Sequence, residues 1–151
     1  MNNFPLATQL RNHKLVIESQ KKLIEADKMA VLKAKWDCAI AIAIGPEMRQ
    51  KLFDKVETFS GDFKYFTFVV MDSHTVPNRK GGTPYEIPLN GGGNMFCAVR
   101  DGKVSQTTLY DWYPPFETVR DFYLKEGFNV EICEEGDGSG MESWLTLVIS
   151  F

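Results

Sequence analysis

Apolar residues recur at helical spacing along the first 44 residues, and after Pro5 no Gly or Pro interrupts this part of the chain. The pattern predicts one long helix over residues 5–44, or two helices with a bend. Its last six residues alternate Ala with Ile, which also suits a strand with one buried face, and we favour the helix. Gly45 would then be the left-handed residue past the helix end. Pro46 would open a second helix that reaches about Thr58. This second helix is expected to bury four apolar side chains: Met48, Leu52, Phe53 and Val56.

The second half of the chain carries strand patterns. Aromatic and β-branched residues over 63–71 predict a central strand that is covered on both faces. Asp101-Gly102 is a type I′ turn signal and predicts a hairpin between residues 95–100 and 103–110. Pro114-Pro115 favours the start of a helix that ends before Gly127, followed by strands over 128–132 and 143–151. These patterns predict an α+β fold, with N-terminal helices packed on a mainly antiparallel sheet of about 4–6 strands and one further helix near 115–126.

Length and composition limit the class of protein. A chain of 151 residues that is 44% hydrophobic predicts a single domain, 1–151, with 1–60 mainly helical and 61–151 forming the sheet around a long loop, 72–94. A net charge of -3 argues against broad binding to duplex nucleic acid or to a membrane surface. The sequence has no leader pattern and no apolar run of bilayer length, so we expect a cytoplasmic protein. The three cysteines, Cys38, Cys97 and Cys133, are far apart and are expected to be buried thiols.

The long loop is the best candidate for binding a ligand. Its glycine clusters allow backbone N–H groups to converge on an anion, and Arg79 and Lys80 supply compensating charge. The glycines match neither the P-loop nor the dinucleotide fingerprint, and a flexible surface loop is the alternative. The aromatic segment from Tyr110 to Phe116 is expected either to stack on a ligand or a partner, or to cap the core. The predicted ligand-binding residues are Arg79, Lys80, Gly81, Gly82, Thr83, Asn90, Gly91, Gly92, Asn94, His74, Trp112 and Tyr113.

No residue is predicted to be catalytic and no cofactor or metal is expected. His74 follows a predicted strand beside Asp72, an arrangement that suits a general base, but a solvated loop histidine is the simpler interpretation. The acidic residues Glu134, Glu135, Asp137 and Glu142 are of the type that binds a hard cation, yet they do not follow the EF-hand order. We favour the simpler interpretation, a solvated hairpin tip with gatekeeping charge.

The C-terminal quarter has a recognisable succession of elements. A helix over 118–126, the strand Gly127-Phe128-Asn129-Val130 and a closing strand over 145–151 resemble the endings of small bacteriophage-encoded α+β proteins. The resemblance implies a protein that acts in the infected bacterial cytoplasm or in a virion. Among such proteins, binders that sequester a host signal or inhibit a host protein are expected.

Three function classes follow from these features. The first is a non-enzymatic protein that binds a small anionic ligand, such as a nucleotide or signalling nucleotide, through the long loop. The second is a protein-binding inhibitor or assembly component that contacts a host protein, or a second copy in a homo-oligomer, through the N-terminal helix and the aromatic segment. The third is a phosphoester-handling enzyme that uses His74.

Overall fold

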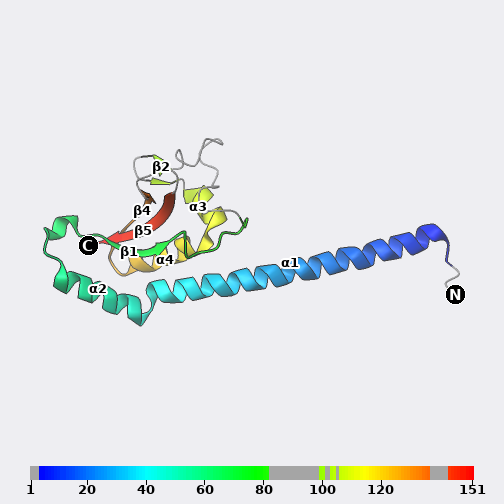
Figure 1. The fold of residues 1–151 in the computed structure, drawn as a ribbon, viewed down its shortest axis with the longest axis horizontal. Coiled ribbons are helices and arrows are strands. Elements are labelled where there is room, and N and C mark those ends of the chain that lie inside the picture. The colour runs from blue at the N-terminus through cyan, green and yellow to red at the C-terminus, as the bar shows by residue number, and fades with distance from the viewer. Residues whose placement is uncertain (1–3, 82–98, 101–102, 105, 137–142) are drawn as a thin grey trace. The chain divides into compact units, whose positions relative to one another are not determined.

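The chain consists of two units, Met1–Ala34 and Lys35–Phe151, and each is described by itself. The structure is a computed structural model that describes residues 4–81, 99–100, 103–104, 106–136 and 143–151 (Figure 1). Helix α1 (Leu6–Ile44) provides nearly all of the first unit and the beginning of the second. Whether the two units form one domain, as the sequence predicts, stays a prediction.

The junction between α1 and α2 (Pro46–Thr58) depends on Gly45. Residues 39–44 are helical, as predicted, but Gly45 is extended, with φ -80° and ψ 175°, so the left-handed prediction is wrong. Glycine is required there for a different reason, because a Cβ atom would lie 2.5 Å from the backbone oxygen of Ala41. The predicted burial along α2 is also wrong. No residue of α2 is buried, and Phe53 is 54% exposed, because the apolar side of this helix borders a groove rather than the core.

The main sheet has three antiparallel strands in the order β1-β5-β4 (Figure 1). They are β1 (Phe68–Asp72), β4 (Asn129–Gly136) and β5 (Ser143–Ser150). The α+β class is therefore confirmed, but among the described residues the main sheet has three strands rather than four to six. The predicted central strand over 63–71 is also wrong, because Phe63–Tyr65 forms a 3₁₀ helix and β1 lies at the sheet edge. The last strand is central, since both its edges are paired.

The second strand of the predicted hairpin is shorter than expected, and residues 95–98 of its first strand lie outside the described part of the chain. Strands β2 (Val99–Arg100) and β3 (Lys103–Val104) pair around Asp101-Gly102, but α3 (Gln106–Trp112) replaces the second half of the predicted strand. Helix formation places Leu109 and Trp112 on one face, where both are buried. The further helix predicted near 115–126 is α4 (Pro114–Lys125), and Gly127 follows it with a φ of 92°.

The core of the second unit lies between α4 and the sheet. Phe116, Val119 and Tyr123 occupy one face of α4 at spacings of three and four residues. They are buried, as are the alternate residues of β5: Leu145, Leu147 and Ile149. Helix α4 contacts both β4 and β5 (Figure 1). The buried face of the helix and the buried face of the sheet therefore form one apolar layer.

The C-terminal end of α1 belongs to this second unit. Trp36 and Ala43 are its buried residues. The indole Nε1 of Trp36 donates a hydrogen bond of 2.6 Å to the backbone oxygen of Pro77, and the Tyr123 hydroxyl donates to the backbone oxygen of Ala43. Cys38 is exposed on the same segment, so its predicted burial is wrong, whereas Cys133 is partly buried and Cys97 lies outside the described residues.

We expect Leu147→Ala to lower the free energy of unfolding by about 2–5 kcal/mol, because it removes a fully buried side chain from the central strand. Val69→Ala is the matched control on the edge strand, where Val69 is 45% exposed, and it should cost less than about 1 kcal/mol. Urea unfolding followed by circular dichroism measures both values. Equal losses from the two variants would contradict the assignment of β5 as the core strand.

Candidate functional site

The beginning of the long loop is fixed to the second unit through its backbone. Pro77 accepts the hydrogen bond from Trp36, and the Arg79 N–H donates to the Trp112 oxygen at 2.8 Å. Asn78, between them, is only 6% exposed. Gly81 has a φ of 74°, a conformation that favours glycine. These contacts therefore fix the backbone at the point where Arg79 and Lys80 leave the surface of the second unit.

Both cations lie next to tryptophan rings. The Arg79 guanidinium carbon is 5.7 Å from the centre of the Trp36 ring, and the Lys80 Nζ is 5.3 Å from the centre of the Trp112 ring. Lys80 also forms an ion pair of 2.8 Å with Asp111. The hydrogen bond and the charge of Lys80 lower the pKa of the Asp111 carboxyl. The charge of Lys80, which was predicted to bind an anion, is therefore already neutralised in part by the Asp111 carboxylate.

The two aromatic residues predicted to contact a ligand are core residues. Trp112 is 7% exposed and Tyr113 is 1% exposed, and the Tyr113 ring stacks on Phe116 at 5.7 Å. Burial raises the pKa of Tyr113, while its interaction with the Asn78 side chain opposes this change. Of the two alternatives for the aromatic segment, the structure supports the one in which it caps the core. Among the described residues, no hydrogen-bond acceptor lies within reach of Trp112 Nε1.

The predicted ligand-binding residues are only partly brought together. Arg79, Lys80 and Trp112 are close to one another, whereas His74 lies in a separate turn with its ring 4.7 Å from that of Trp144. Six of the twelve predicted residues lie outside the described part of the chain: Gly82, Thr83, Asn90, Gly91, Gly92 and Asn94.

The turn over 72–75 explains the sequence Asp-Ser-His-Thr structurally. The Asp72 Oδ1 accepts hydrogen bonds from the backbone N–H groups of His74, at 2.9 Å, and Thr75, at 3.1 Å. Ser73 extends the sheet beyond β1, since its N–H donates to the Leu145 oxygen and its Oγ accepts from the Leu145 N–H. Asp72 therefore serves as a turn-capping residue, a common role for aspartate at strand ends.

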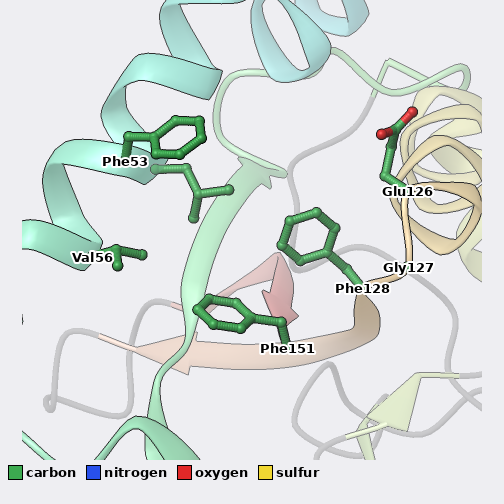
Figure 2. A pocket seen from close by; sticks show the side chains of 7 residues that line it. Phe53, Val56, Glu126, Gly127, Phe128 and Phe151 are labelled. Carbon is green, nitrogen blue, oxygen red and sulfur yellow. The ribbon is translucent and has the colours of Figure 1, made fainter.

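Apolar side chains line a groove beside α2 that the sequence analysis did not identify. Figure 2 shows Phe53 and Val56 of α2 across from Phe128 and Phe151, which flank β4 and β5. The cavity there has a volume of about 300 Å³, and an adjoining one of about 470 Å³ extends past Arg49 to the start of α2. Phe151 is 61% exposed, so both walls of the groove contact solvent.

The first unit exposes apolar side chains along its whole length. Nine large apolar residues between Leu6 and Val31 have exposed fractions of 37–70%. Six of them belong to two rows that repeat every seven residues and are here called the apolar stripe: Leu10, Ile17, Ile24 and Val31 in one row, with Val16 and Leu23 in the other. The sequence shows helical spacing over this segment, and the seven-residue period within it is the more specific signal.

In comparisons with known proteins, no family model, no curated protein and no solved structure matches the chain. Within the described residues, no group of three or more His, Cys, Asp or Glu side chains is arranged to hold a metal ion. No helix in that part of the chain is both long enough and apolar enough to cross a bilayer.

We expect Lys80→Met to raise the pKa of Asp111 toward the ordinary aspartate value, because the main cause of its depression is removed. The wild-type ion pair stabilises the fold above the pKa of unfolded Asp, and this contribution is lost as the pH falls through the lower folded pKa. Carboxyl ¹³C NMR across an acid titration measures the change. Lys64→Met, which removes a cation that pairs with Asp62, is the control and should leave Asp111 unchanged.

Proposed function

We propose that this protein is an interaction or assembly component that binds protein through the helix over residues 6–34. The observation that supports this proposal is the apolar stripe. Its six large apolar side chains are exposed to solvent, and within each row they are spaced by seven residues along the helix. In water such a helix gains most of its stability by burying its apolar side against another element.

The seven-residue period favours a helical partner. An amphipathic helix that packs on a globular core follows a period of about 3.6, whereas a period of 3.5 keeps one side in contact with another helix over several turns. The longer row has four members, from Leu10 to Val31, separated by three intervals of seven residues. The aromatic segment is not part of this proposal, because Trp112 and Tyr113 are buried in the core.

Ile17→Ser/Ile24→Ser removes the centre of one row of the apolar stripe, and we expect it to abolish most association. Immobilised full-length chain is exposed to a mixture of its own free chain and a bacterial lysate, and the retained protein is quantified by mass spectrometry. The variant should retain at least about tenfold less than wild type, as expected for the loss of two buried apolar anchors.

Glu18→Ser/Lys22→Ser is the matched control, because it introduces the same two residues on the opposite side of the same helix. It should retain as much protein as wild type. If the stripe variant and wild type retain equal amounts, the helix is not an association element.

Binding of a small anion is the second candidate. It is supported by the anchored loop start, which holds Arg79 and Lys80 beside two tryptophans. The ion pair between Lys80 and Asp111 makes this candidate less favoured, because a ligand has to compete with a carboxylate that is already in place.

If the anion proposal is correct, nucleotides raise the melting temperature of the protein and Arg79→Ala/Lys80→Ala removes this increase. The control Lys51→Ala/Lys55→Ala removes two exposed cations from α2 and should keep the increase. Absence of a shift with mono-, di- and cyclic nucleotides would exclude this candidate. Loss of the shift in the control would show nonspecific charge attraction.

A further inference from the structure

A row of three polar residues lies between the two rows of the apolar stripe. His13, Gln20 and Asp27 are spaced by seven residues, and each is exposed on α1. The row containing Ile17 and Ile24 flanks this polar row on one side, and the row containing Val16 and Leu23 flanks it on the other. A partner helix that covers the stripe therefore also covers the polar row.

We propose that the helical partner is a second copy of the chain, packed antiparallel over residues 6–34 with its two-fold axis at Gln20. This inference rests on the proposal that the helix is an association element. The juxtaposition that supports it is the placement of His13 and Asp27 seven residues before and seven residues after Gln20. The His13 ring can donate a hydrogen bond, and the Asp27 carboxylate can accept one.

In an antiparallel pair centred on Gln20, two residues lie at the same height along the helix axis when their residue numbers add up to 40. His13 then faces the partner's Asp27, and this contact occurs twice because the interface is two-fold symmetric. The imidazole N–H can donate to the carboxylate whether or not the ring carries a charge. Gln20 meets its own copy, and an amide side chain both donates and accepts.

The same geometry matches the apolar rows. On one side of the polar row, Ile17 lies one residue, or about 1.5 Å of helix rise, from the height of the partner's Ile24. On the other side, Val16 lies equally close in height to the partner's Leu23. Lys14, Lys21 and Lys28 form a row outside the isoleucines, where their stems cover apolar surface and their charges stay in water.

A parallel pair is disfavoured by the same residues. In register, it places Asp27 against the partner's Asp27 and His13 against the partner's His13, so two carboxylates face each other without a donor. The polar row therefore selects the antiparallel orientation, in which the lysine rows of the two chains lie on the same side with their charges in water, while the apolar stripe supplies most of the buried area.

Two single-cysteine additions test the orientation directly. Purified His13→Cys and Asp27→Cys chains are oxidised separately and after mixing, and disulfide-linked peptides are mapped by mass spectrometry, which also distinguishes them from products of the exposed Cys38. The antiparallel pair gives a 13–27 cross-link only in the mixture. Cross-links of 13 to 13, or of 27 to 27, in the separate samples would overturn the proposal.

Sedimentation equilibrium of the full chain tests the pairing itself. Wild type should be a dimer, and Asp27→His should weaken dimerisation about tenfold because both histidine–carboxylate contacts are lost. The swap His13→Asp/Asp27→His restores the contacts and should recover the wild-type constant. Equal weakening in the single and swapped variants would overturn the proposal.

The experiments distinguish a failure of the dimer proposal from a failure of the proposed function. A monomeric wild-type chain that still retains lysate proteins through the apolar stripe overturns the second copy as partner and leaves the association role in place. A monomeric chain with no stripe-dependent retention overturns both.

Discussion

The central position of β5 is the constraint on which the second unit depends. Strand β5 pairs with β1 on one edge and with β4 along its whole length on the other, and its inward residues meet α4. Its two partners are far apart in the sequence, so β5 joins residues 68–72 to residues 129–136 in one sheet. The same core holds Tyr123, whose hydroxyl binds the backbone of Ala43 and so attaches the end of α1.

The position of this core explains why the aromatic segment is structural. Leu109, Trp112, Tyr113 and Phe116 follow one another through α3 into α4 and are all buried. Their burial orders the start of the long loop through the hydrogen bond between Arg79 and the Trp112 backbone. An anion that binds near Arg79 would therefore not meet an open aromatic wall, which is why we propose association ahead of ligand binding.

The two units handle apolar surface differently. In the second unit, alternate strand residues and one face of α4 are buried together, although the groove beside α2 keeps Phe53 and Phe151 in contact with solvent. In the helix over 6–34, the side chains of the apolar stripe are exposed. In the dimer that we propose, a second chain covers that stripe, and the polar row between the apolar rows favours the orientation that pairs His13 with Asp27.

Local pattern by itself determined α1, α2, α4 and the final strands. The uninterrupted apolar spacing before Gly45, the Pro114 start and the Gly127 stop each reflect a backbone preference that does not depend on distant residues. Tertiary structure decided the remaining features. Strand order placed β5 in the centre, and burial of Leu109 and Trp112 made 106–112 helical instead of extended. For the candidate site, the sequence identified the cations Arg79 and Lys80. It did not show that Asp111 neutralises the charge of Lys80, because these two residues are neighbours only in the folded chain.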